Sequence, residues 1–179
     1  MKQVQVLDKT FTTYITKVEI TERINAIAKE LNERYSHKKP MFIAVLNGAF
    51  LFASEIFAQF EHPAEISFVK VASYHGTESS GEIKTLIGLN SAIQGRDLII
   101  IEDIIDTGKT FHELLPNIHA QNPASIAIVS LLVKPEALKY PVKADYVGFE
   151  IPNKFVVGYG LDYDGYGRNL PEIYQIVSE

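Results

Sequence analysis

The sequence predicts one α/β domain whose parallel sheet is covered by helices on both faces. Short runs of apolar residues alternate with longer segments that have helical spacing. The 179 residues are enough for one domain, and the 46% hydrophobic and 22% charged content is typical of globular proteins. We find no internal repeat or Pro/Gly/Ser-rich linker, so we expect a single domain over residues 1–179.

The first predicted element is an amphipathic helix over residues 18–35. Apolar side chains recur at helical spacing between Ile20 and Leu31, which places them on one face. Thr16 and Glu19 have the spacing of a capping box, in which each side chain accepts a backbone N–H from the other residue. The helix should therefore begin directly after Thr16.

A strand, a helix and a second strand follow. Residues 41–46 are all apolar and predict a buried strand that ends at Asn47 and Gly48, with a short helix over 49–60. Residues 65–73 contain the β-branched and aromatic side chains that strands favour. The polar residues 74–84, which carry two glycines, are expected to form a loop.

The second half repeats this alternation. We expect a wholly apolar strand over 98–101, a helix over 111–119, and two further strands over 125–133 and 146–151. The segment 152–168 is rich in tyrosine and glycine and fits neither period, which indicates a cap over an edge of the sheet.

Composition excludes several classes of protein. The 17 basic and 22 acidic residues give a formal net charge of −5, which argues against bulk affinity for nucleic acid or anionic membranes. No apolar run is long enough to span a membrane, and the first residues lack the apolar core of a secretory signal. The absence of cysteine excludes disulfides, thiolate metal sites and a cysteine nucleophile. We therefore expect a cytoplasmic protein.

The residues that follow the 98–101 strand carry the strongest chemical signal. Ligands of open α/β sheets bind beyond the carboxyl ends of the strands, where we expect these residues to lie. Thr107 to Thr110 should form a tight turn whose amides and following helix N-terminus suit a phosphate monoester. The adjacent carboxylates of Glu102 and Asp103 suit a vicinal diol or Mg²⁺. Phosphate, diol and metal together describe a phosphorylated ribose.

Two other interpretations of this segment are weaker. An ATP-binding P-loop requires glycine five residues before Gly108, where Asp103 stands, and the acids would repel a polyphosphate. A solvated acidic turn before a helix is common. Three acids and Gly-Lys-Thr within nine residues, directly after an apolar strand, make that explanation insufficient.

The segment Glu102-Asp103-Ile-Ile-Asp106-Thr107-Gly108-Lys109-Thr110 resembles the phosphoribosyl-pyrophosphate signature of type I phosphoribosyltransferases. The segments 147–152 and 155–163 are similar to hypoxanthine-guanine phosphoribosyltransferases in particular. The resemblance implies a Rossmann-like parallel sheet flanked by helices, with a flexible lid loop and a small hood formed by N-terminal residues and about 152–170. It also implies purine salvage: transfer of 5-phosphoribosyl from phosphoribosyl pyrophosphate to hypoxanthine, and to guanine, giving IMP or GMP and pyrophosphate. The expected cofactor is Mg²⁺, and the expected assembly is a homodimer or homotetramer.

The resemblance assigns a role to each matching residue. Asp106 would act as the general base that accepts a purine proton, which contributes roughly 10²–10⁴-fold to the rate. The remaining roles are the 5′-phosphate for Asp106, Thr107, Gly108, Lys109 and Thr110; ribose and metal for Glu102 and Asp103; pyrophosphate for Leu46, Asn47, Gly48 and Arg168; the purine for Lys134, Phe155, Val156 and Asp162; a second metal contact for Asp162; and the lid for Ser73 and Tyr74.

Several of these residues also have a structural explanation. Asn-Gly alone is commonly a turn, and a lone arginine such as Arg168 is commonly a surface charge. Phe155 could be a core aromatic, and Lys134 could be a strand-end lysine with a buried stem. Many relatives have lysine at position 47, so Asn47 removes one cation from a loop that, in the family, contains a non-proline cis peptide. The lid segment is equally compatible with an exposed hairpin.

Three alternative functions stay open at this stage. An ammonium only donates hydrogen bonds, so Lys134 would pair with a 6-oxo group and oppose the amino group of adenine, while xanthine remains possible. A nucleotide sensor that binds RNA would need a basic face, which the pI of about 5.6 does not support. An oligomer-forming α/β protein without chemistry would not need so many site residues.

Overall fold

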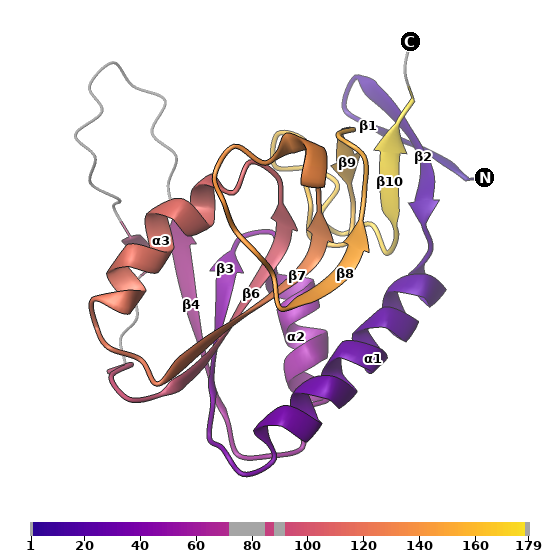
Figure 1. Cartoon of the computed structure of the whole chain (residues 1–179). Helices are drawn as coiled ribbons and strands as arrows, with labels where there is room; N and C mark the ends of the chain where they lie inside the picture. Colours follow the sequence, from indigo (N-terminus) through magenta and orange to yellow (C-terminus); the bar gives the residue numbers. More distant parts are fainter. Residues whose placement is uncertain (1, 72–84, 88–91, 178–179) are drawn as a thin grey trace, which may run out of the picture.

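The computed structural model describes residues 2–71, 85–87 and 92–177 and confirms the predicted α/β architecture (Figure 1). The larger sheet has the spatial order β5-β4-β3-β6-β7-β8, and its pairs are parallel except for β4 with β5. Its strands are β3 (Met41–Leu46), β4 (Glu65–Val71), β5 (Thr85–Ile87), β6 (Asp97–Ile105), β7 (Ser125–Val133) and β8 (Tyr146–Glu150). A 3₁₀ turn, η1 (Pro135–Ala137), follows β7.

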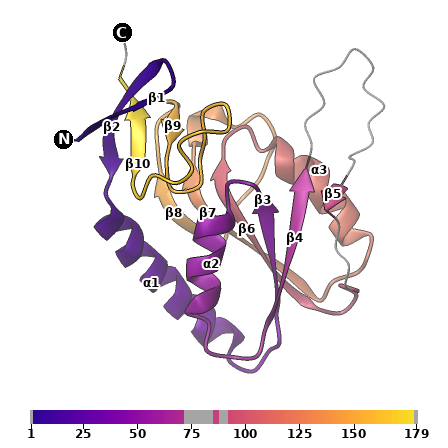
Figure 2. The same cartoon turned by 180° about the vertical axis from the view of Figure 1, so that it is seen from behind.

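Helices cover both faces of this sheet. Figures 1 and 2 show α1 (Lys17–Tyr35) and α2 (Phe50–Ala58) on one face and α3 (Lys109–His119) on the other. Side chains alternate along β6: Ile99 and Ile101 pack in the core beneath α1 and α2, while Ile100 packs in the core beneath α3. Two buried layers explain why β3 is apolar at every position and why β6 is apolar from Leu98 to Ile101.

The start of α1 is fixed as the sequence predicts. Thr16 is the N-cap, and the reciprocal capping box with Glu19 is present. Further along the helix, the guanidinium of Arg23 donates to the carbonyl oxygens of Val147 and Gly148 on β8, at 2.7–3.2 Å. This contact joins α1 to the edge strand of the larger sheet.

A second, four-stranded sheet forms the hood. It has the order β1-β2-β10-β9 and contains β1 (Gln3–Val6), β2 (Lys9–Ile15), β9 (Val156–Val157) and β10 (Ile173–Ile176). Its own small core includes Phe11, Val157 and Tyr174. The hood therefore includes the N-terminal residues as expected, but it extends beyond residue 170 because β10 pairs with both β2 and β9.

The end of β6 differs from the prediction. The strand expected over 98–101 continues to Ile105, because Ile104 and Ile105 pair with Leu132 and Val133 of β7. The expectation that all the acids lie beyond the strand was wrong: Glu102 and Asp103 belong to the strand itself. In the described ranges, no helix is long and apolar enough to cross a membrane.

Candidate active site

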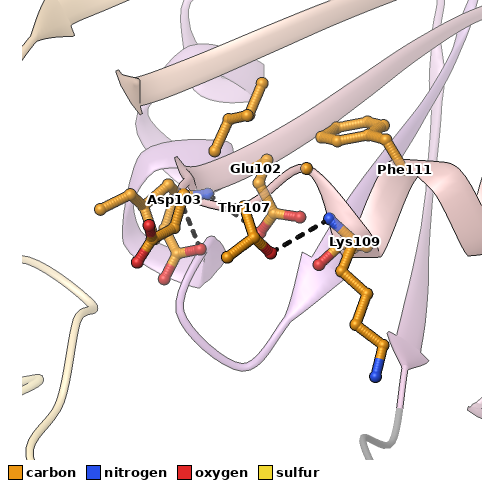
Figure 3. A pocket seen from close by; sticks show the side chains of 10 residues that line it. Glu102, Asp103, Thr107, Lys109 and Phe111 are labelled. Carbon is orange, nitrogen blue, oxygen red and sulfur yellow. Dashed lines mark hydrogen bonds between the residues drawn. The ribbon is translucent and has the colours of Figure 1, made fainter. Parts of the chain in front are cut away.

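The loop between β6 and α3 forms an open pocket of about 240 Å³ lined by residues 102–111. The hydroxyl of Thr107 accepts the backbone N–H of Lys109 at 3.3 Å, as Figure 3 shows. Gly108, with φ of +79°, is the N-cap of α3 and provides no side chain to cap it. The first N–H groups of a helix lack intrahelical partners, so this end of α3 suits an anion.

The phosphate loop (Asp106–Thr110) is held from behind by the segment that follows η1. The carbonyl oxygen of Thr107 accepts the N–H groups of both Lys139 and Tyr140 at 3.0 Å. A Cβ on Gly108 would lie 2.5 Å from the Tyr140 carbonyl oxygen. Glycine is required here by both the positive φ and the close backbone approach.

Glu102 and Asp103 form an unusual pair of carboxylates. Glu102 is 5% exposed, and its Oε2 has no hydrogen-bond partner among the described residues. Burial and, to a smaller extent, repulsion from Asp103 raise the pKa of Glu102 well above its usual value. Burial also raises the pKa of Asp103. Figure 3 shows the Lys109 side chain extending away from both acids, and its ammonium lies 3.6 Å from Glu113 instead.

The loop Leu46–Gly48 meets the acids at the end of β3. Its Leu46–Asn47 peptide is cis, as in the family that the sequence resembles. A Cβ on Gly48 would overlap the carboxylate of Asp103, and a Cβ on Gly160 would overlap the carbonyl oxygen of Gly48. The backbone of Gly48 is therefore enclosed between Asp103 and Gly160.

Asp106 and Lys134 are brought together by neighbouring strands. The Lys134 ammonium lies 3.1 Å from Oδ2 of Asp106, and the two side chains are 7% and 45% exposed, respectively. The backbone N–H of Lys134 donates to the carbonyl oxygen of Ile105 at 2.9 Å, which fixes the lysine beside the end of β6. Lys134 is therefore not a strand-end lysine whose ammonium reaches open solvent.

Arg168 and Asp162 also form a pair. The Arg168 guanidinium lies 2.7 Å from Asp162 Oδ1 and donates to the Gly160 carbonyl oxygen at 2.7 Å. Asp162 additionally accepts the N–H of Gly165 at 2.7 Å. Arg168 is therefore held in place by the hood and is not a freely mobile surface charge.

Phe155 is 44% exposed, so it is not the core aromatic that the sequence left open. Its ring is supported by Phe11 of β2 and Tyr163, with ring centroids 6.3 and 5.9 Å away. Tyr163 in turn donates to the Asp8 carboxylate at 2.9 Å. The next residue, Val156, is buried and begins β9, where it lies opposite Gln175 of β10. An aromatic face presented in this way suits a planar base.

Mg²⁺ fits the donor set only with help from a ligand. No group of three His, Cys, Asp or Glu side chains that could hold a metal occurs in residues 2–71, 85–87 and 92–177. Mg²⁺ is commonly held by one or two carboxylates plus waters and substrate phosphates. Glu102 and Asp103 match that pattern, because Oε2 of Glu102 has no hydrogen-bond partner in the part of the chain that the structure describes. Asp162, predicted as a further metal contact, is already paired with Arg168.

Most of the predicted site residues converge on the carboxyl end of the parallel sheet. Ser73 and Tyr74 lie outside the described residues. Sequence reasoning missed three supports of the site: Gly160 beside Gly48, Tyr140 behind the phosphate loop, and Phe11 behind Phe155. The glycine on each side of Tyr159 was a usable signal for Gly160, whereas nothing local marks Tyr140 or Phe11.

Comparison with known proteins shows the family of the chain. The sequence model of the phosphoribosyl transferase domain matches residues 14–164. The chain is 43% identical over 160 residues to the hypoxanthine-guanine phosphoribosyltransferase of Bacillus subtilis, covering 89% of this chain and 89% of that protein. A solved hypoxanthine phosphoribosyltransferase from Staphylococcus aureus superimposes with a TM-score of 0.87 at 36% identity, covering 93% of this chain and 91% of that one.

A longer relative matches equally well. The bifunctional protein TilS/HprT of Listeria innocua is 43% identical over 160 residues, which cover 89% of this chain but 25% of that protein. The chain thus spans about a quarter of the length of such bifunctional relatives. From the domain match and the full-length relatives together, the chain belongs to the phosphoribosyl transferase family, in its hypoxanthine-guanine branch.

Proposed function

We propose, from the premise that the chain belongs to this family, that it transfers 5-phosphoribosyl from phosphoribosyl pyrophosphate to hypoxanthine and guanine in purine salvage. The pair of Asp106 and Lys134 carries this proposal. The imidazole N7 and the 6-oxo oxygen of these purines lie on one edge of the ring. A carboxylate that accepts the ring proton beside an ammonium that donates to the oxo group complements that edge.

The other contacts supply what the transfer requires. The phosphate loop, with the N-terminus of α3, binds the 5′-phosphate. The exposed ring of Phe155 stacks on the base, and the backbone of Val156 contacts it. Leu46–Gly48, called the pyrophosphate loop below, and Arg168 bind the leaving pyrophosphate. For Ser73 and Tyr74, which lie outside the described residues, the role of a lid that excludes water from the oxocarbenium-like sugar stays a prediction.

Mg²⁺ is the proposed cofactor. Glu102 and Asp103 would hold it together with the ribose hydroxyls, and it would neutralise charge that develops on the leaving pyrophosphate. Asp162 would contact a second ion. Because Asn47 adds no cation to the pyrophosphate loop, Mg²⁺ and Arg168 must provide most of the positive charge.

Xanthine is the second candidate base. It carries the same N7 and 6-oxo edge as hypoxanthine, so Asp106 and Lys134 accept it equally well. Contacts near the 2-position of the ring decide between xanthine and hypoxanthine. Adenine presents an amino group where Lys134 needs an acceptor, which leaves two donors opposed in a buried site.

The protein is also proposed to act in the cytoplasm as a homodimer or homotetramer, without nucleic acid. Phe50 of α2 and Phe68 of β4 are 40% and 39% exposed, so a second copy that covered them would remove apolar surface from water.

The test is turnover with phosphoribosyl pyrophosphate and each of hypoxanthine, guanine, xanthine and adenine, with Mg²⁺ and after chelation. Transfer to 6-oxopurines, lost on chelation, is expected, with adenine at least about 100-fold poorer. Lys134→Gln should raise the KM for hypoxanthine and narrow the gap to adenine. Nucleotide binding without turnover of any base would instead favour the sensor.

A further inference from the structure

The backbone of the pyrophosphate loop meets the hood at Gly160. The carbonyl oxygen of Gly48 occupies the space where a side chain on Gly160 would lie. Gly160 is itself fixed, because its N–H donates to the Arg168 carbonyl oxygen and its own carbonyl oxygen accepts from the Arg168 guanidinium, at 3.0 and 2.7 Å. Movement of the hood strap (Gly158–Asp162) therefore moves both the pyrophosphate loop and Arg168.

The residue that anchors this strap to the helices is Tyr159. Its side chain is 2% exposed, and its ring lies 4.7 Å from the ammonium of Lys17 at the start of α1. The same ammonium lies 2.6 Å from the carboxylate of Glu55. Glu55 belongs to α2, which begins directly after the pyrophosphate loop. Three elements thus meet at one lysine: α1, α2 and the strap.

We propose that Lys17, Glu55 and Tyr159 form a positioning cluster that sets the geometry of the pyrophosphate loop. The cluster joins α2 to the strap. The pyrophosphate loop lies between them, because α2 follows the loop in the chain and the strap contacts the loop at Gly48. The inference rests on the proposed function for the identity of the ligand, pyrophosphate. None of the three residues touches the reacting atoms, so they are positioning residues and not catalytic ones.

The composition of the loop makes this positioning important. Asn47 brings no charge, so the loop binds an anion through backbone N–H groups, whose strength depends on distance and angle. A cation held over an aromatic face and paired with a carboxylate restrains three elements at once, and each partner orients the others. The ion pair is partly exposed, at 42% and 34%, so its contribution to overall stability is small. The contribution of the pair is to hold α1, α2 and the strap in a fixed arrangement.

The molecule contains a matched control for this cluster. Lys38 lies 2.7 Å from the Asp97 carboxylate and 5.6 Å from the ring of the buried Tyr35, at the opposite end of the larger sheet. The ammonium-bearing side chains of Lys38 and Lys17 are 45% and 42% exposed. The two lysines therefore have the same kinds of partner and similar exposure, but only Lys17 adjoins the site.

The experiment compares Lys17→Met, Lys17→Arg and Lys38→Met in the full chain. Isothermal calorimetry measures the affinity of each protein for pyrophosphate in the presence of Mg²⁺. Steady-state kinetics give separate KM values for phosphoribosyl pyrophosphate and hypoxanthine. Lys17→Met should weaken pyrophosphate binding and raise the KM for phosphoribosyl pyrophosphate about tenfold, because small misplacements of binding groups are costly. The KM for hypoxanthine should rise less than the KM for phosphoribosyl pyrophosphate, since no cluster member adjoins Asp106 or Lys134 and only the last residue of the strap, Asp162, is assigned to the purine.

Lys17→Arg should restore binding, because arginine keeps the cation over the ring. Lys38→Met should lose a similar amount of thermal stability without a change in pyrophosphate binding. Equal behaviour of Lys17→Met and Lys38→Met, or an equal rise in both KM values, would overturn the proposal. Absence of transfer by the unmodified chain would refute the proposed function, whereas the calorimetric comparison still decides the role of the cluster.

Discussion

The two ends of β6 carry carboxylates in opposite circumstances. At the first residue, Asp97 accepts hydrogen bonds from Lys38 and Ser125, and its pKa is lowered although burial acts in the other direction. Near the last residues, Glu102 and Asp103 have raised pKa values, and one oxygen of Glu102 lacks a partner among the described residues. One strand thus has a satisfied end and an unsatisfied end.

This difference separates stability from function along a single element. A partly buried carboxylate with charged and hydroxyl donors, such as Asp97, stabilises the fold, whereas a buried carboxylate oxygen without a donor costs free energy unless a ligand completes it. Changes at the Asp97 end should therefore alter stability and leave activity intact. Changes at the Glu102 end should alter activity more than stability.

The largest expected effect is at Asp106, directly beyond the unsatisfied end. Asp106→Asn keeps the shape of the side chain but removes the base, so kcat with hypoxanthine should fall by roughly 10²–10⁴-fold. The melting temperature should fall somewhat, because the amide no longer balances the charge of Lys134, whose side chain is only 7% exposed. Steady-state kinetics and thermal unfolding measure the two quantities. A variant that loses stability but retains kcat would contradict the assignment.

A smaller effect is expected at Gly48. In Gly48→Ala the new methyl group would displace the Asp103 carboxylate, so kcat/KM for phosphoribosyl pyrophosphate should fall about 30-fold. Gly165→Ala is the control, because Gly165 has φ of +86° but no atom within 4 Å of its Cβ position among the described residues. It should cost about 1 kcal/mol of stability through backbone strain and leave kcat/KM unchanged. Equal kinetic losses in both variants would show that the clash with Asp103 is irrelevant.

The smallest effect is expected at the satisfied end. Asp97→Asn should lower the free energy of unfolding at pH 7 by roughly 1–3 kcal/mol without changing kcat. Because the pKa of Asp97 is lowered from 3.8 in the folded state, its contribution is present above that pH and is lost as the pH falls through the folded value. Urea unfolding at pH 7 and pH 3 should show the difference between the two proteins shrinking at the lower pH. A difference that does not depend on pH would mean that packing, and not the charge, is responsible.

Much of the fold was predictable from sequence because the elements are locally consistent. The alternation of apolar strands and amphipathic helices identified β3, β7 and α1 closely, and the capping box fixed the start of α1. The hairpin of β1 and β2 and the strand β10 were missed. β1 pairs with the adjacent β2, but β2 and β10 pair across almost the whole chain, and distant partners of that kind leave no periodic signal in either sequence.

The site was predictable where one segment carries several groups and not where contacts cross between segments. Glu102 to Thr110 form such a segment, and the structure places them around one pocket. The pairing of Asp106 with Lys134, and of Asp162 with Arg168, follows from strand order and the turn of the hood. The end of β6 was misjudged because acids normally terminate a strand, whereas here pairing with β7 carries the strand past them.

The contact of Arg23 with β8 has a consequence for how copies of this chain can meet. An edge strand exposes unpaired carbonyl and amide groups that can recruit a strand from another molecule. Arg23 already occupies the carbonyl groups of Val147 and Gly148 and places a charge beside them. Growth of the sheet from one molecule into the next is therefore disfavoured along this border.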